Sequence, residues 1–142
     1  MRGQYGSIIL DVAIRLLVPF YLIYGVYVLV HGHYSPGGGF QAGVVFAASI
    51  ILVNMVQGDK VTWGISKQNA LLVAAIGTFI YAGIGIAAII WGGNYLDYGV
   101  LPLGEIPPKI RALGTLGIET GVTLGVAGTF IVIFNLLIGR EE

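Results

Sequence analysis

Hydrophobic residues fill four long stretches of this chain, and polar or glycine-rich segments separate them. Residues 16–58 contain no Asp, Glu, Lys or Arg, a run about twice the roughly 20 residues that cross a ~30 Å hydrocarbon core. The segment 31–40 divides this run in the manner of a turn. Because backbone polar groups in lipid must bond within their own segment, each stretch predicts a transmembrane helix.

The pattern therefore predicts an all-α integral membrane protein with short loops, and residues 1–142 are expected to form one transmembrane domain. Pro107 and Pro108 suit the first turn of the last helix, where no backbone donor is needed. Four spans put both termini on one side, and the Lys and Arg residues of that side favour a cytoplasmic location. The expected helices cover about residues 5–30, 40–57, 68–91 and 109–138.

The composition agrees with a membrane location. Only 10% of the residues are charged and the mean hydropathy is +0.89, against about 25% charged residues in soluble domains. We expect a multi-pass protein of the cell membrane, with lipid around its helices. The chain has no cysteine and a formal net charge of zero, so it offers no thiolate metal site and no basic surface typical of nucleic-acid binding. We expect no metal and no resident cofactor.

Glu119 is the acidic residue that lies deepest in a predicted span. A helix that begins near Lys109 places it about 15 Å deep at ~1.5 Å per residue, near the middle of a ~30 Å core. A carboxylate there costs roughly 2.5–3.5 kcal/mol on insertion scales. Thr115 and Thr123, four residues to either side, share its face. The three residues are candidates for an ion path, and the alternative is a structural carboxyl at a subunit interface.

Five glycines form a stripe on nearly the opposite face of the same helix, and small residues let another helix approach closely. They are Gly114, Gly117, Gly121, Gly125 and Gly128. Asp11 and Arg15, spaced i, i+4, are expected to pair near the start of the first helix. They serve there either as a helix anchor or at the mouth of a path.

His31 and His33 flank a glycine at the far end of the first span. Imidazole ionises near neutral pH, so the two residues are either a proton relay or ordinary interface residues. Tyr21, Tyr24 and Tyr27 precede them in the same span, and their hydroxyls are expected to find hydrogen-bond partners inside the bundle.

The turn between the first two spans contains three consecutive glycines, each of which is costly to order. A plain hairpin turn rarely needs them, so they indicate close backbone approaches. Irregular backbone at membrane depth is tolerated where it is buried in protein or lines water. The sequence of the turn is His33-Tyr34-Ser35-Pro36-Gly37-Gly38-Gly39-Phe40-Gln41-Ala42-Gly43-Val44-Val45.

This turn closely resembles the signature of the MnhB/MrpB family, whose members are subunits of Mrp-type multisubunit sodium/proton antiporters, and chain length and helix layout are also similar. The resemblance implies a small subunit among other membrane subunits of an antiporter module, with Na⁺ and H⁺ as the transported ions. It also implies that Pro36 and Phe40 matter for antiport. Similar subunits occur in complex I-related hydrogenases and sulfur-reducing complexes, so redox subunits are a second implied set of partners.

The main functional expectation is an accessory subunit that packs against sister subunits and helps line a sodium path. It performs no bond chemistry itself, although a redox-driven host complex would. One midplane acid and one acid–base pair are few charged groups for a complete antiporter. Two alternatives stay open, a self-sufficient homo-oligomeric four-helix transporter built around Glu119 and a purely structural adaptor.

Overall fold

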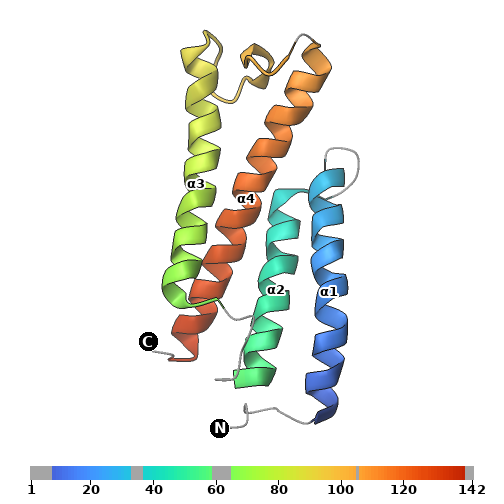
Figure 1. Cartoon of the computed structure of the whole chain (residues 1–142). Coiled ribbons are helices and arrows are strands. Elements are labelled where there is room, and N and C mark those ends of the chain that lie inside the picture. The colour runs from blue at the N-terminus through green and yellow to red at the C-terminus, as the bar shows by residue number, and fades with distance from the viewer. Residues whose placement is uncertain (1–7, 33–36, 59–64, 105, 140–142) are drawn as a thin grey trace.

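The computed structural model describes residues 8–32, 37–58, 65–104 and 106–139. Over these residues the chain forms four long helices, one short 3₁₀ helix and no strand (Figure 1). Each of the long helices is long and apolar enough to cross a membrane, which confirms the predicted fold class. The elements are α1 (Ile8–His31), α2 (Gly39–Gln57), α3 (Lys67–Ile90), η2 (Tyr98–Val100) and α4 (Pro107–Leu137).

The observed helix ends lie close to the predicted ones. α4 begins at Pro107 rather than near Lys109, because both prolines occupy its first turn and proline needs no donor there. Residues 5–7 of the predicted first helix lie outside the described residues. Ile8 and Leu137 lie at the same end of the molecule (Figure 1), as an even number of spans requires.

The helices pack side by side in the order α1, α2, α4, α3 (Figure 1). α2 and α4 occupy the centre and run in the same direction. α1 packs on α2 and only slightly on α4, and α3 packs on α4. The outer faces of α1 and α3 therefore form the two edges of this row.

The close approach of another helix that the glycine stripe of α4 predicts is made by α3, against which Gly117, Gly121 and Gly128 pack. A Cβ atom built on Gly121 would lie 2.9 Å from the carbonyl oxygen of Gly77, and one on Gly128 would lie 2.5 Å from that of Ala70. A Cβ atom on Gly77 would in turn overlap the backbone of Gly125. These distances are too short for real side chains, so glycine is what brings the two backbones together.

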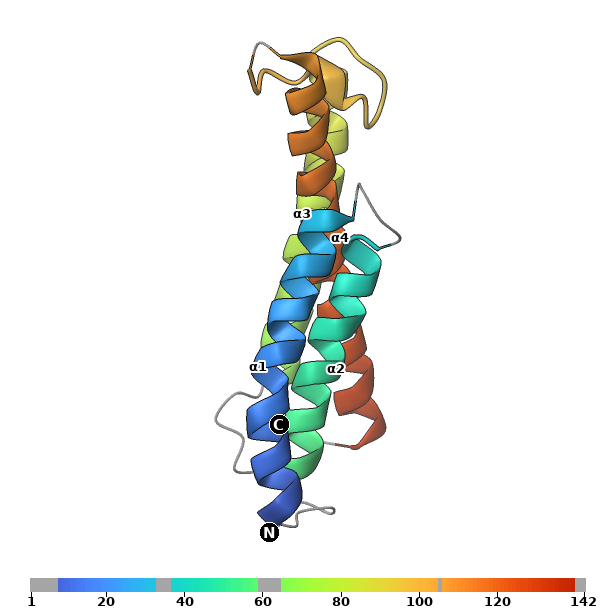
Figure 2. The ribbon, with the colours of Figure 1, turned by 90° about the vertical axis from the view of Figure 1, so that its right-hand side faces the viewer.

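The α1–α2 hairpin is displaced along the helix axes relative to the α3–α4 hairpin (Figures 1 and 2). The contacts of Gly117 with Ile84 and of Gly121 with Tyr81 put Glu119 level with a residue about eight positions before the end of α3. At ~1.5 Å per residue, that level is about 12 Å below the end of α3. Because α3 is about 36 Å long and a hydrocarbon core is ~30 Å thick, this level lies within the core.

The connection from α3 to α4 lies at the end of the molecule where the α3–α4 hairpin extends beyond α1 and α2 (Figure 1). Tyr98 packs on Gly114, and burial, with a smaller contribution from Tyr81, raises the pKa of the Tyr98 phenol. The Oδ1 atom of Asp97 accepts a hydrogen bond from the Gly99 amide at 3.3 Å and lies 4.0 Å from the Arg111 guanidinium. These contacts pack the connection between α3 and α4 against the first two turns of α4.

Candidate ion-path site

The Glu119 carboxylate lies against the end of α1 and the beginning of α2. A Cβ atom on Gly32 would lie 2.9 Å from Oε1 and 3.0 Å from Oε2, and one on Gly38 would lie 3.4 Å from Oε1. The Oε2 atom is buried. The tightest contact of a Cβ atom on Gly32 would be with the Gly38 backbone, at 2.5 Å, so glycine at this position brings the end of α1 close to the beginning of α2 beside the carboxylate.

The positive end of the α2 helix dipole favours a carboxylate at the position of Glu119. Gly38 precedes the helix with φ 124°, a conformation that favours glycine, and as the N-cap residue it has no side chain of its own to cap the helix. The first amide N–H groups of a helix have no intrahelical acceptor and carry its positive dipole end. A carboxylate beside a helix N-terminus is typically stabilised by about 0.3–1 kcal/mol, which offsets part of the cost of placing Glu119 in the membrane.

Thr123 holds α2 and α4 together beneath the carboxylate. Its buried hydroxyl lies 3.0 Å from the carbonyl oxygen of Gly39 and 2.7 Å from that of Glu119, and it can donate to either. A Cβ atom on Gly39 would overlap the Glu119 backbone, and one on Gly43 would lie 2.8 Å from the Thr123 carbonyl oxygen. Glycines of the turn therefore let α2 meet α4 at the acid.

The structure brings together only part of the predicted site. Thr115 is half-buried one turn above Glu119, and its hydroxyl makes no hydrogen bond with the described residues. Gly37, Phe40 and Gln41 are exposed, with Phe40 at 59%. Ser35, Pro36 and His33 lie outside the described residues.

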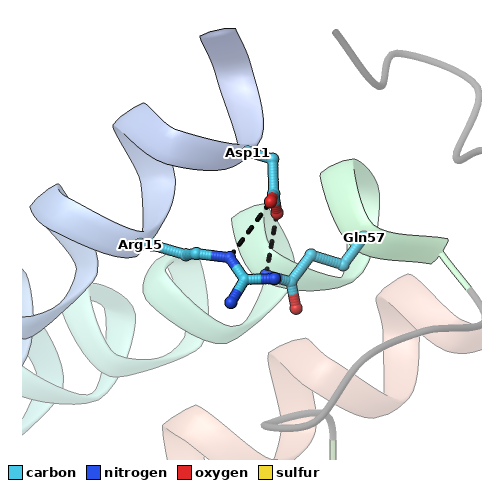
Figure 3. Close-up of polar contacts among 3 residues, drawn as sticks. All are labelled: Asp11, Arg15 and Gln57. Carbon is cyan, nitrogen blue, oxygen red and sulfur yellow. Dashed lines mark hydrogen bonds and ion pairs between the residues drawn. The ribbon is translucent and has the colours of Figure 1, made fainter. Parts of the chain in front are cut away.

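Asp11 and Arg15 form the predicted pair, at the opposite end of α1 from Glu119 (Figures 1 and 3). The Arg15 Nε atom donates to Asp11 Oδ2 at 3.0 Å. The Gln57 amide donates to Asp11 Oδ1, also at 3.0 Å, and thereby joins α1 to the end of α2. Within the described residues this cluster is a helix–helix anchor far from the acid.

Replacing Gln57 with leucine is expected to weaken this anchor without affecting the acid. A typical hydrogen bond contributes about 0.5–1.5 kcal/mol to the free energy of unfolding, and we expect a loss in this range because the Asp11 carboxylate is partly exposed to solvent. We expect a small decrease in the melting temperature of the purified chain in detergent. Met55→Leu, at an exposed position two residues earlier, is the control, and an equal change in both variants would contradict the anchor role.

The tyrosines of α1 were expected inside the bundle, and this prediction is wrong for the isolated chain. Tyr21, Tyr24 and Tyr27 are 42%, 56% and 55% exposed, because α2 covers only the face of α1 that carries Ile14, Val18 and Gly25. His31 is also exposed. Its ring stacks on Tyr27, and its Nδ1 atom lies 3.2 Å from the Tyr27 carbonyl oxygen.

Two residues of these clusters were not singled out by the sequence. Gly32 forms one wall of the carboxylate position, and Gln57 binds Asp11. Glycine and glutamine at helix ends are common and give no signal by themselves. The signal for Gly32 was its place one residue after the end of α1, beside a second glycine-rich segment.

Comparison with known proteins shows which family the chain belongs to. A family model described as a domain related to the MnhB subunit of Na⁺/H⁺ antiporter matches residues 9–139, and so covers the four long helices except for Ile8. The chain belongs to the MnhB family. This confirms the family resemblance of the turn sequence and agrees with a multi-pass membrane protein.

Curated relatives of this MnhB-family chain carry antiporter names. It is 28% identical over 139 residues to the B-type subunit of the Na⁺/H⁺ antiporter of Bacillus subtilis (strain 168), covering 96% of each chain. It is 26% identical over 142 residues to a Staphylococcus aureus (strain Newman) protein named as antiporter subunit mnhB2, covering 96% of this chain and 98% of the relative. An uncharacterized Methanocaldococcus jannaschii protein is 32% identical over 66% of this chain and 36% of its own length.

Proposed function

We propose that this chain is an accessory subunit of a multisubunit Na⁺/H⁺ antiporter, packed against sister subunits, and that Glu119 contributes to the cation path between them. The observation that carries the proposal is the Glu119 carboxylate, which lies beside Gly32 and Gly38 at a depth of about 12 Å from the end of α3. Acidic residues at membrane depth mark ion or proton pathways by default. Membership of the MnhB family supports the antiporter context.

The position suits relay of a cation better than complete transport by this chain. Glu119 is the acidic side chain of the described residues that lies at this depth, while Asp11 lies near the other end of α1. A path across the whole membrane needs further polar groups. Sister subunits supply them in this proposal, and Na⁺ and H⁺ are the ions that move.

The first test is Glu119→Gln in the assembled antiporter. Glutamine keeps the size and loses the charge, and a lost charged interaction of about 1.5–3 kcal/mol corresponds to a roughly ten- to hundredfold effect. We expect Na⁺-dependent proton exchange in everted vesicles to fall by at least about tenfold. The amount of assembled complex, measured by co-purification, is expected to stay the same.

Thr120→Val is the matched control, because Thr120 is the next residue and its hydroxyl bonds only within α4, to the Leu116 carbonyl oxygen. It is expected to keep exchange near the unmodified level. Full exchange by Glu119→Gln in an intact complex would instead make the chain a structural adaptor. Exchange by the purified chain alone in liposomes would replace the subunit proposal with a homo-oligomeric transporter.

The host complex is identified by what co-purifies from native membranes. Antiporter subunits alone would make the host a secondary exchanger. Iron–sulfur or nickel–iron subunits would make this chain part of the ion-translocating side of a hydrogenase or sulfur-reducing complex.

A further inference from the structure

An aromatic face of α1 has no role in the site described above. It consists of Tyr21, Tyr24, Tyr27 and His31, and we refer to it as the α1 aromatic face. The Tyr24 and Tyr27 rings stack with centroids 6.4 Å apart, and Tyr27 and His31 stack at 4.3 Å. In Figure 2 the helix that carries this face lies open along its length. Neither α2 nor α4 covers these rings.

The depth of this face excludes the usual explanation for exposed tyrosines. Tyr and Trp gather in belts at the membrane–water interfaces. Here α1 ends at the level of Glu119, about 12 Å below the end of α3, and Tyr27 and Tyr24 lie one and two turns lower, at about 18 and 22 Å. Because α3 is about 36 Å long, both rings lie near the middle of the hydrocarbon core.

A tyrosine hydroxyl at that depth needs a hydrogen-bond partner. Within the described residues the hydroxyls of Tyr21, Tyr24 and Tyr27 make no hydrogen bond, and lipid tails offer none. An unsatisfied hydroxyl in hydrocarbon is strongly unfavourable. The outer face of α3 is different, since its exposed side chains at the same depths include Leu72, Ile76 and Phe79. That face suits lipid, and the α1 aromatic face does not.

We propose that the α1 aromatic face docks a transmembrane helix of another subunit, and that this helix presents hydrogen-bond acceptors to the tyrosine hydroxyls. The proposal rests on the accessory-subunit function proposed above. A second copy of this chain is a poorer occupant. The exposed residues Leu17 and Phe20 beside the rings on α1 are large, whereas close pairing of this face with its own copy would favour small residues.

The test is site-specific photo-crosslinking in membranes that contain the whole antiporter. A benzophenone amino acid replaces Tyr24 or Tyr27, and Phe79 on the outer face of α3 is the matched control at an apolar, exposed position. We expect crosslinks from positions 24 and 27 to one other membrane subunit and none from position 79. Crosslinks from 24 and 27 only to lipid, or only to a second copy of this chain, would overturn the proposal.

A conservative variant separates hydrogen bonding from packing. Tyr24→Phe with Tyr27→Phe keeps both rings and removes both hydroxyls. We expect the share of the chain that co-purifies with its partners to fall by about threefold for each hydroxyl, the effect of a typical interhelical hydrogen bond. Tyr95→Phe, in the connection between α3 and α4, is the control. Unchanged retention of the double variant would remove the hydrogen-bonding part of the proposal.

The two proposals fail in different ways. If the chain co-purifies with antiporter subunits but positions 24 and 27 give no crosslink to them, the docking face is wrong and the subunit function stands. If no other subunit co-purifies from membranes that hold the complete set, both proposals are overturned.

Discussion

Gly39→Ala is expected to separate the beginning of α2 from α4 and to destroy the position of the Glu119 carboxylate. A Cβ atom on Gly39 would overlap the backbone of Glu119, and backbone in the middle of α4 cannot turn aside as a side chain can. Overpacking of this kind typically lowers the free energy of unfolding by about 1–3 kcal/mol, and here we expect at least the upper value. The measurements are the melting temperature in detergent and the amount of chain in membranes.

Gly37→Ala is the matched control for this variant. A Cβ atom on Gly37 would lie 3.4 Å from the nearest atom, Val28 Cγ1, which is an ordinary contact. The same substitution two residues away is therefore expected to leave both measurements almost unchanged. If Gly39→Ala and Gly37→Ala behaved alike, the close approach of α2 to α4 at Glu119 would be wrong.

Gly77→Ala is expected to have the second large effect, on the α3–α4 pair. A Cβ atom on Gly77 would meet backbone atoms of Gly121 and Gly125 on the opposite helix. α3 and α4 must then move apart along the whole glycine stripe of α4, and the contacts that Gly121 and Gly128 make with α3 are lost as well. We expect a decrease in stability of about 1–3 kcal/mol, seen as earlier aggregation on heating in detergent.

Gly83→Ala tests whether the effect comes from the contact or from the residue type. Gly83 lies on the same helix, is exposed, and a Cβ atom there would meet nothing within 4 Å. Alanine is the better helix former by about 0.5–1 kcal/mol, so this variant is expected to be as stable as the original chain or slightly more stable. If Gly83→Ala destabilised the chain as much as Gly77→Ala does, the close packing of α3 on the glycine stripe of α4 would be contradicted.

The four helices could be predicted because the bilayer leaves the backbone few choices. α3 was expected over residues 68–91 and extends over Lys67–Ile90, since a long apolar run in lipid can only be a helix. The displacement of one hairpin along the other could not be predicted. It depends on which residues of α4 meet the first glycines of α2. Here Gly39 meets Glu119 and Gly43 meets Thr123, a pairing that the spacing of the glycines does not specify.

Only those residues of the site could be predicted that are polar and yet lie deep in a membrane-spanning helix. Glu119 and Thr123 stood out for that reason, and they do meet the glycine-rich turn. Thr115 shared their helical face, but α2 begins one turn below it. The tyrosines of α1 were placed inside the bundle because hydroxyls need partners. A tyrosine hydroxyl within a membrane does need a hydrogen-bond partner, but the sequence does not show whether that partner belongs to the same chain.

The displacement of the hairpins gives the molecule different widths in the two leaflets. α1 and α2 end at the depth of Glu119, so within the described residues four helices displace lipid in the leaflet that holds Asp11 and Lys67, and chiefly α3 and α4 do so in the other. Among the described residues, a protein tapered in this way has less bulk in the leaflet above its buried acid than in the other. If Glu119 takes cations as proposed, whatever lies beside it in that leaflet, the bulk of a sister subunit or water, sets how they arrive from that side.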